Sequence, residues 1–429
     1  MKLLALYAVP GEGVRTVYEI DGGVEVRTAL GDRVSSIVEE HPEAVWPERE
    51  AHDLYGVEFE GHDPMRPLID HAEGRTAWQV PVRGHGSHEV AVGPIHAGVI
   101  ESGHFRFHVV GERILHLDLR LFYKHRGLER AAEGTPVECG IVYAHRACAA
   151  CAVSNSIAYA RAGERVLGIE ETREMARSRN LLLELERLYN HLHDLSAICA
   201  GVGFAAGAMA FAALKERAQR LNDELFGHRF LFGTVAVGQS VLVRVGSATR
   251  EVDAITTDEA TVWKEMLFNA SVQDRLAGVG VLNHAAAVRL GAVGPTARAS
   301  GVAIDARSDV EPALPEKASG DVAARAEVRH LELQATGLRL RELLGTDLEE
   351  SRAEAGGDGD AVGIGRVESP RGETVCCLEA NDGAVTRFHL RTASYRNWPA
   401  LAEAAAGNIL PEFPLINKSF ELCYACVDR

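Results

Sequence analysis

The sequence lacks several features that would assign it to a class of protein at once. It contains no run of about 18 apolar residues, so no segment is predicted to cross a membrane. Its 429 residues include only 8 cysteines, too few for a disulfide framework, which favours a reduced, cytosolic setting. Its 61 acidic residues outnumber 45 basic ones, and a net charge of −16 would repel nucleic acid. No internal repeat or low-complexity segment occurs.

The apolar N-terminal segment is too short for a secretory signal, because Pro10 interrupts it early. A first β-strand is predicted there instead. A protein exported together with a partner would need no signal of its own.

The composition, with 46% hydrophobic and 25% charged residues, is that of a globular protein with ample material for a large core. Residues 1–70 form a small unit in which apolar and polar positions alternate over residues 14–26, and a helix is predicted around residues 34–40. Residues 71–88 are rich in Gly, His and charge and are predicted to be a linker. A strand pattern follows in residues 89–120.

The middle of the chain has helical periodicity. Leucines recur at steps of four and three and predict a helix over about residues 171–200. They are Leu181, Leu185, Leu188, Leu192 and Leu195. The polar side chains opposite them predict a solvated or ion-paired face rather than a site; they are Glu184, Arg187, His191 and Asp194. Further helices are expected at about 206–226, 250–275 and 318–346, and strands at 362–368, 373–379 and 384–391.

Two CxxC pairs, Cys148/Cys151 and Cys423/Cys426, offer four thiolates. Four thiolates can bind zinc, an iron–sulfur cluster or a soft transition-metal centre. A self-contained zinc ribbon closes within about 20 residues, whereas more than half of this chain lies between the pairs. The fold must therefore bring them together in the interior of a large domain. The remaining cysteines have no such context and are predicted to be free thiols; they are Cys139, Cys199, Cys376 and Cys377.

Five ordered segments resemble motifs of one known family. Residues 146–151 and 422–429 resemble the two metal motifs of nickel–iron hydrogenase large subunits, and residues 93–105, 126–129 and 368–372 resemble other motifs of that family. The sequences of these motifs are most similar to those of the membrane-bound, complex I-related branch, which includes the formate hydrogenlyase and energy-converting types.

Residues 48–62 resemble a small hydrophilic subunit of complex I, which that branch often carries fused. The resemblance implies an α+β fold: a small N-terminal α/β domain (residues 1–75) joined to a large, mainly helical domain with peripheral β-sheets (residues 85–429). It also implies assembly with an iron–sulfur small subunit and membrane subunits, dependence on maturation proteins, and a peripheral position on the cytoplasmic face of the cell membrane.

The resemblance further implies a nickel–iron centre with CO and CN ligands on iron. Cys148 and Cys423 would be terminal on nickel, and Cys151 and Cys426 would bridge the metals. Cys423 would also serve as the base that takes a proton from dihydrogen. Glu101 would carry that proton outward with a pKa raised by burial; the alternative is an ordinary glutamate at a strand edge.

Two further charged residues receive roles from the resemblance. Arg371 would overhang the metals with a guanidinium that cannot lose its proton; the alternative is a salt-bridged surface arginine. Glu129 would bind a structural Mg or Fe ion, and an ordinary charged helix residue is the alternative. The chain departs from the family at Asn155, where a histidine is usual, and at Cys376, where relatives often have histidine. Arg429 stands where many hydrogenases have a metal-binding histidine, although the complex I-related branch often has arginine there.

Two other functions remain open at this point. A non-hydrogenase subunit of a complex I-like assembly, quinone-linked or structural, would hold zinc or no metal at the four cysteines. A scaffold stabilised by zinc is the other, and it is the commoner use of two CxxC pairs in general.

Overall fold

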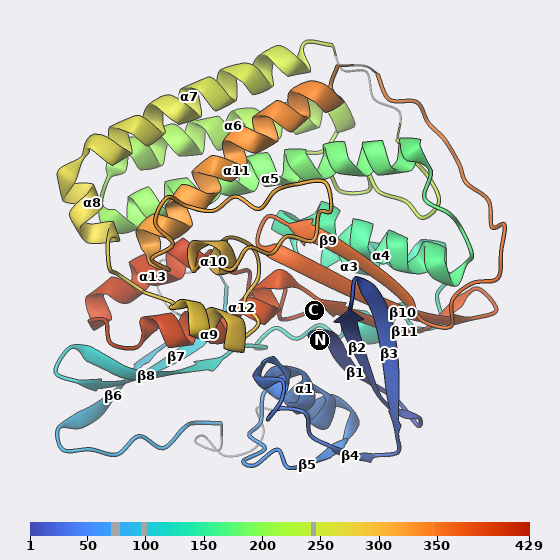
Figure 1. The fold of residues 1–429 in the computed structure, drawn as a ribbon, viewed down its shortest axis with the longest axis horizontal. Helices are drawn as coiled ribbons and strands as arrows, with labels where there is room; N and C mark the ends of the chain where they lie inside the picture. The colour runs from blue at the N-terminus through green and yellow to red at the C-terminus, as the bar shows by residue number, and fades with distance from the viewer. Residues whose placement is uncertain (70–77, 96–100, 242–245, 346) are drawn as a thin grey trace.

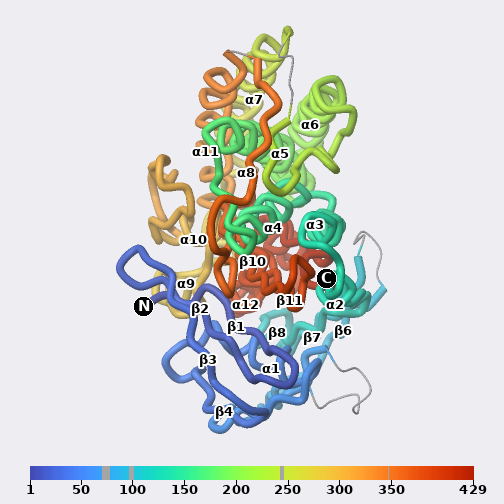
Figure 2. Tube along the Cα trace, turned by 90° about the vertical axis from the view of Figure 1, so that its right-hand side faces the viewer, coloured from blue at the N-terminus to red at the C-terminus, as the bar shows by residue number. Residues whose placement is uncertain are grey.

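The computed structural model describes residues 1–69, 78–95, 101–241, 246–345 and 347–429. Long helices form one end of the molecule, the N-terminal residues form the other, and the C-terminal segments lie between them (Figures 1 and 2). The expected α+β class, with a small N-terminal unit and a larger helical part, is confirmed.

The N-terminal unit combines two small sheets with one helix. Its strands β1 (Lys2–Val9), β2 (Gly13–Ile20) and β3 (Gly23–Leu30) form an antiparallel sheet. Strand β4 (Arg33–Ser35) pairs in parallel with β5 (Glu58–Glu60), and helix α1 (Val45–Tyr55) connects them.

The helix predicted around residues 34–40 is wrong, because residues 33–35 pair as a strand. Glu48 of α1 then accepts hydrogen bonds from Ser36 Oγ and the Ile37 backbone at 2.8 Å each, which fixes an irregular turn. Of the predicted linker (residues 71–88), residues 71–77 lie outside the described part of the chain. Residues 78–86 contain no helix or strand, as expected, whereas Ser87 and His88 are already part of a strand, so the predicted linker extends two residues too far.

The N-terminal unit shares a hydrophobic cluster with the C-terminal sheet. That sheet is antiparallel and contains β9 (Gly363–Ser369), β10 (Gly372–Asn381) and β11 (Ala384–Arg391). The cluster joins Leu4, Tyr7 and Val17 to Val375 and Cys377. Burial of apolar area is the main favourable term in such packing, so the two parts are fixed to each other.

A third antiparallel sheet supports the segment before the first cysteines. It contains β6 (Ser87–Val92), β7 (His104–Val110) and β8 (Arg113–Arg120). Phe105, Phe107 and Val109 point to its buried face, as their alternation predicts.

The helical part contains the predicted long helices, a further long helix at residues 152–166 that the sequence patterns did not predict, and several short helices. The long ones are α4 (Ala152–Val166), α5 (Arg173–Val202), α6 (Ala205–Phe226), α7 (Ala248–Phe268) and α11 (Val322–Leu343). The shorter ones are α2 (Leu128–Ala132), α3 (Val137–Arg146), α8 (Ala270–Leu276), α9 (His284–Arg289), α10 (Gly294–Ala299), α12 (Ala393–Ala405) and α13 (Phe413–Phe420). The helix expected at 250–275 is divided, because the Asn269 side chain accepts from Val272 N and begins α8.

Helix α5 is buried on both faces. Its leucines are in the main core, and its polar face contacts α11. His191 Nε2 lies 2.7 Å from Glu332 Oε2, and Arg329 Nε donates to Asp194 Oδ2 at 2.9 Å. The polar face is therefore ion-paired, one of the two expected states, and it is not solvated.

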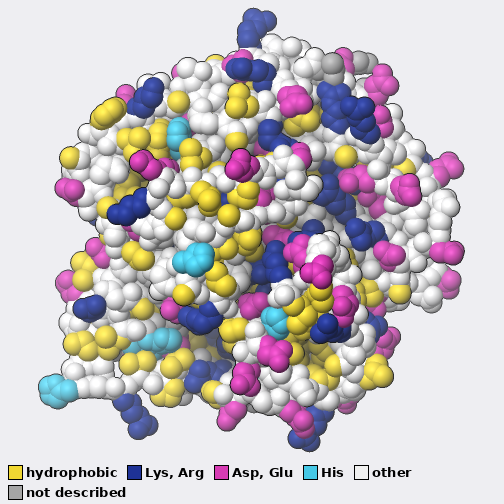
Figure 3. Space-filling model, viewed as in Figure 1, with side chains coloured by type: hydrophobic (Ala, Val, Ile, Leu, Met, Phe, Trp, Pro, Cys, Tyr) yellow, Lys and Arg dark blue, Asp and Glu magenta, His cyan; other side chains and the backbone are white. Residues whose placement is uncertain are grey.

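The outer surface carries both signs of charge. In Figure 3, acidic and basic side chains are interspersed with scattered apolar ones over the face seen in Figure 1. Among the described residues, none of the helices combines the length and the apolar character that a bilayer crossing requires.

Candidate metal centre

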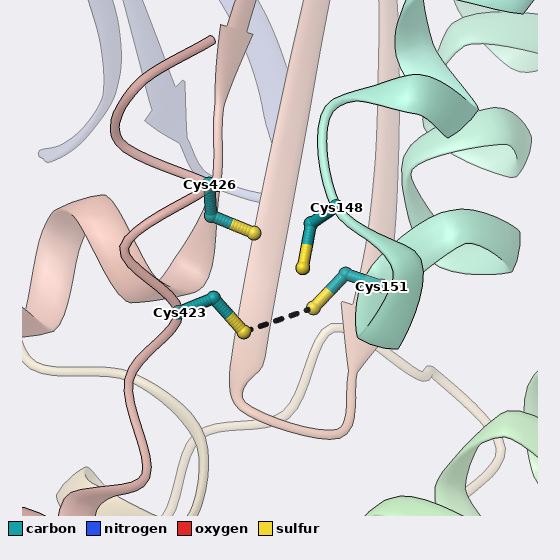
Figure 4. A group of neighbouring side chains, drawn as sticks. All are labelled: Cys148, Cys151, Cys423 and Cys426. Carbon is teal, nitrogen blue, oxygen red and sulfur yellow. Dashed lines mark hydrogen bonds between the residues drawn. The ribbon is translucent and has the colours of Figure 1, made fainter. Parts of the chain in front are cut away.

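The four cysteines of the CxxC pairs meet in the interior. Cys148 and Cys151 flank the short turn that leads into α4, and Cys423 and Cys426 lie in the loop after α13 (Figure 4). All four sulfur atoms lie within 4.8 Å of one another, and Cys151 Sγ is 3.9 Å from Cys423 Sγ. A metal–sulfur bond of about 2.3 Å places tetrahedral sulfurs about 3.8 Å apart. The four thiols are thus spaced to bind one compact metal centre.

The surroundings of the four sulfurs favour the thiolate form of Cys423. Hydrogen bonds from Cys148, Cys151 and Cys426, together with the charge of Arg371, hold the pKa of Cys423 well below its usual range. Sulfur hydrogen bonding and burial raise the pKa of Cys151 and Cys426. A soft metal ion displaces thiol protons readily when one thiolate is already present.

Arg126 connects the two cysteine segments. Its Nη2 donates to the carbonyl oxygens of Ala147 at 2.7 Å and Ala425 at 2.9 Å, and its Nη1 donates to the Arg146 carbonyl at 2.9 Å. Its backbone N–H donates to Asp428 O at 2.9 Å. The sequence placed Arg126 in a family motif but gave no reason to assign it this role, because backbone carbonyls leave no sequence signal.

Hydroxyl groups before and at the start of α12 hold the second cysteine pair. Ser394 Oγ accepts from the Cys423 backbone N–H at 3.0 Å. Thr392 Oγ1 donates to the Cys426 carbonyl at 3.2 Å.

Helix α5 holds the first cysteine pair. Glu186 Oε2 accepts from Val153 N at 2.7 Å and Oε1 accepts from Ser154 N at 3.1 Å, so this carboxyl caps the N-terminus of α4. Asn190 Nδ2 donates to the Ala150 carbonyl at 2.8 Å. Burial raises the pKa of Glu186 to about 7, although the hydrogen bonds from Ser154 and Val153 lower it.

Arg371 is buried beside this centre, between β9 and β10. Its Nη1 donates to Asn190 Oδ1 at 2.8 Å, Nη2 to Asp194 Oδ1 at 3.3 Å, and Nε to the Glu421 carbonyl at 2.5 Å. Although burial opposes the charge, Cys423 and Asp194 raise its pKa well above the usual range. The surface-arginine alternative is excluded, and a fixed positive charge lies next to Cys423.

Glu101 lies against the backbone of the second cysteine pair. Its Oε2 accepts from the Ala425 backbone N–H at 2.8 Å, and its side chain is partly exposed. Burial and the negative charge of Cys423 raise its pKa, while the Ala425 hydrogen bond lowers it. Residues 96–100, which precede it in the motif, lie outside the described residues. Glu101 is thus a carboxyl group between the cysteine loop and the surface.

Glu129 is buried and fully bonded in a separate cluster. Its Oε1 accepts from Arg429 Nε at 2.7 Å and from Leu390 N at 2.8 Å. His389 and Glu50 are also close enough that one atom of each lies within 4.8 Å of a Glu129 oxygen. Although burial opposes ionisation, Arg429 and then His389 hold the pKa of Glu129 well below its usual range.

Asn155 lies one turn after Cys151 on α4, and it is completely buried. Among the described residues, its side-chain amide has no hydrogen-bond partner. An unpaired buried amide is costly, and this one lies four residues after Cys151, on the same side of the helix. Cys376 is buried in β10 and is not part of the four-sulfur group.

Comparison with protein families assigns this fold to the class of complex I subunits. Residues 7–84 match the family of the respiratory-chain NADH dehydrogenase 30 kDa subunit, and residues 202–344 and 358–429 match that of the 49 kDa subunit.

Curated relatives narrow this class. The chain is 30% identical to hydrogenase-4 component G and 30% identical to formate hydrogenlyase subunit 5, both of Escherichia coli (strain K12). Each match covers 92% of this chain, with 75% and 76% of the relative, respectively. This chain belongs to the family of complex I-related hydrogenase large subunits and carries an N-terminal domain of the complex I 30 kDa type.

A solved structure has the same fold. It is a chain of the membrane-bound sulfane sulfur reductase, an archaeal respiratory membrane complex, with a TM-score of 0.71 and 23% identity. The match covers 80% of this chain and 99% of that one.

Proposed function

We propose that this protein is the catalytic large subunit of a membrane-associated nickel–iron hydrogenase, which interconverts dihydrogen with protons and electrons. One observation carries the proposal: four cysteine sulfurs, three of them on buried residues, lie within 4.8 Å of one another, and the charges of Arg371 and Glu101 both interact with Cys423. The relatives support this reading, because three of them are named as hydrogenases or hydrogenase components and another as a formate hydrogenlyase subunit.

The residues present fit a nickel–iron centre with CO and CN ligands on iron. Four thiols supply the soft donor set, Arg371 supplies a fixed cation for anionic ligands, and the unpaired amide of Asn155 offers a hydrogen bond. Cys148, Cys151, Cys423 and Cys426 would hold the two metals. When bound, such a centre polarises dihydrogen for heterolytic cleavage and takes up its electrons.

The protein's own side chains then manage the proton. Cys423 would accept it at Sγ, the role that the resemblance to the hydrogenase family gives this thiolate, next to the fixed positive charge of Arg371. Glu101 takes it next and releases it outward, since its raised pKa allows it to exchange protons closer to neutrality. Arg371 keeps its own proton and holds the charge of the site constant.

Electrons would come from a partner. Among the described residues, the remaining cysteines form no second group that could hold an iron–sulfur cluster. We therefore assign electron relay to an iron–sulfur small subunit, and docking to membrane subunits of a complex I-like assembly on the cytoplasmic face. Maturation proteins would insert the centre. The division into residues 1–75 and 85–429 belongs to the same proposal.

Infrared spectroscopy with metal analysis on the same purified sample tests the proposal. Sharp bands of iron-bound CO and CN, together with nickel and iron, are expected. Zinc alone without those bands would overturn the hydrogenase assignment and favour a non-hydrogenase subunit of a complex I-like assembly.

A further inference from the structure

The guanidinium of Arg429 lies between carboxylates from both parts of the chain. Its Nε donates to Glu129 Oε1 and its Nη2 donates to Glu50 Oε1, each at 2.7 Å. Glu50 belongs to α1 in the N-terminal unit, whereas Glu129 belongs to α2. The guanidinium also lies 4.7 Å from the ring centroid of Tyr395. We call Glu50, Glu129, His389 and Arg429 the Arg429 cluster.

Without the arginine, the other three members of the cluster would be a ligand set for a divalent cation. One ligand atom of each of Glu50, Glu129 and His389 lies within 4.8 Å of the other two, and all three residues are buried. Carboxylate oxygens and imidazole suit several divalent metals.

Arg429 already supplies the positive charge that such a divalent cation would bring. Both oxygens of Glu129 face donors: Oε1 faces Arg429 and the Leu390 backbone, and Oε2 lies 3.4 Å from His389 Nδ1 and 3.5 Å from Arg387 Nη1. A second cation would be repelled by two guanidinium groups. The Mg or Fe ion that the resemblance assigns to Glu129 therefore does not fit here while Arg429 is in place.

We propose that Arg429 occupies an internal cation site shared by the two parts of the chain, and that through it Glu50 holds the C-terminal cysteine segment in position. Cys426 precedes Arg429 by three residues, so a fixed arginine restricts the loop that carries Cys423 and Cys426. Removing one partner of a buried ion pair leaves an uncompensated charge, which is strongly destabilising. The loop would then open more often.

Glu50 has a different role from the other polar contacts at the same boundary. Arg366 binds Glu19 at 2.9 Å, and Arg15 lies 3.3 Å from Glu379, without involving the C-terminal segment. Those pairs and the shared hydrophobic cluster fix the N-terminal unit on the sheet β9–β11. Loss of the Glu50 charge should therefore affect the cysteine loop while the N-terminal unit stays attached.

A cavity of about 120 Å³ lies beside the cluster, and the exposed residues His125 and Arg130 are part of its lining. Its lining includes Glu50, Glu129 and Arg429, with Tyr55 and His125. When Arg429 is replaced by alanine, a guanidinium ion from solution can take the vacated place between the two carboxylates.

The test uses the full-length chain with Co²⁺ loaded at the four cysteines, followed by its thiolate-to-metal absorption while a chelator removes it. Glu50→Gln and Arg429→Ala should release Co²⁺ about tenfold faster than the unmodified protein, within the range known for outer partners of metal ligands. Glu379→Gln, at the same boundary but away from Arg429, should change the release rate less than about twofold. Millimolar guanidinium should restore slow release in Arg429→Ala and should not do so in Glu50→Gln.

Two results would overturn the inference. One is a Glu50→Gln release rate equal to that of Glu379→Gln; the other is a fast Arg429→Ala rate that guanidinium does not slow. Because Co²⁺ is the probe and no hydrogen turnover is measured, either result leaves the proposed hydrogenase activity to be decided separately by the infrared bands.

Discussion

Asp194 binds Arg371 through one carboxylate oxygen and Arg329 through the other, at 3.3 and 2.9 Å. This single side chain therefore connects the cation beside the cysteines with the buried polar interface between α5 and α11. Although burial opposes its ionisation, Arg371 and Arg329 lower its pKa, so Asp194 remains charged. The position of Arg371 therefore depends on Asp194, which belongs to α5 and lies outside both cysteine segments.

Asp194→Asn should strongly destabilise the fold, because it leaves two buried guanidinium groups with one neutral partner. Breaking a buried ion pair costs about 3–5 kcal/mol. Chemical denaturation followed by circular dichroism measures the loss. Asp253→Asn is the matched control, since Asp253 pairs with Arg341 on the exposed outer side of α7 and should cost less than about 1 kcal/mol. Equal losses for the two variants would contradict the assigned role of Asp194.

Local patterns in the sequence predict the helices and strands better than they predict burial. The leucine repeat locates α5 within two residues at each end, since a 3.6-residue period is a local property. The same repeat leaves open whether Glu184 and His191 face water. Their burial depends on Glu332 and Thr336 of α11, which supply the opposing polar groups from a distant segment.

The candidate site likewise has residues that the sequence predicts and contacts that it does not. Spacing marks the cysteines as a potential ligand set, and the resemblance selects Glu101 and Arg371 for testing. Nothing in the sequence indicates that Arg126 would bind carbonyls of both cysteine segments, or that Glu50 would reach Arg429, because both contacts require the finished fold.

Arg126→Ala should weaken metal binding without unfolding the protein. The side chain is exposed, so its loss leaves no buried charge, but the two cysteine segments lose the hydrogen bonds that connect them. Loss of a group that hydrogen-bonds to metal-ligand segments typically lowers metal affinity by about 10–100-fold. Competition of Co²⁺ between the protein and a chelator measures this change. Arg130→Ala, on the exposed side of α2, should leave the affinity unchanged; a similar loss there would remove the special role of Arg126.

Glu186 should make the stability of the protein depend on pH. Its folded pKa of about 7 lies above the usual 4.5, so the folded state binds the proton more tightly than the unfolded state does. The stabilising contribution is complete below about pH 4.5 and is lost as the pH rises to about 7, which amounts to about 3 kcal/mol. Denaturation of the metal-free protein at several pH values gives the slope. Glu186→Gln, which cannot ionise, should flatten it, and parallel slopes for the two proteins would rule the effect out.

Glu101→Gln should stop proton delivery while leaving the metal bound. Glutamine keeps the oxygen that accepts the Ala425 N–H, so the cysteine loop retains its shape, but it cannot carry a proton. General acid–base groups contribute about 10²–10⁴-fold to rate, and exchange between D₂ and water should fall by about that factor with unchanged metal content and infrared bands. Glu89→Gln, an exposed change in the nearby strand β6, should exchange at the normal rate. Cys423→Ser should abolish the exchange altogether, because it removes both a ligand of the metal centre and the proposed base. Normal exchange in Glu101→Gln would show that another side chain carries the proton. Asp428 would then be the first candidate, since burial raises its pKa to about 6.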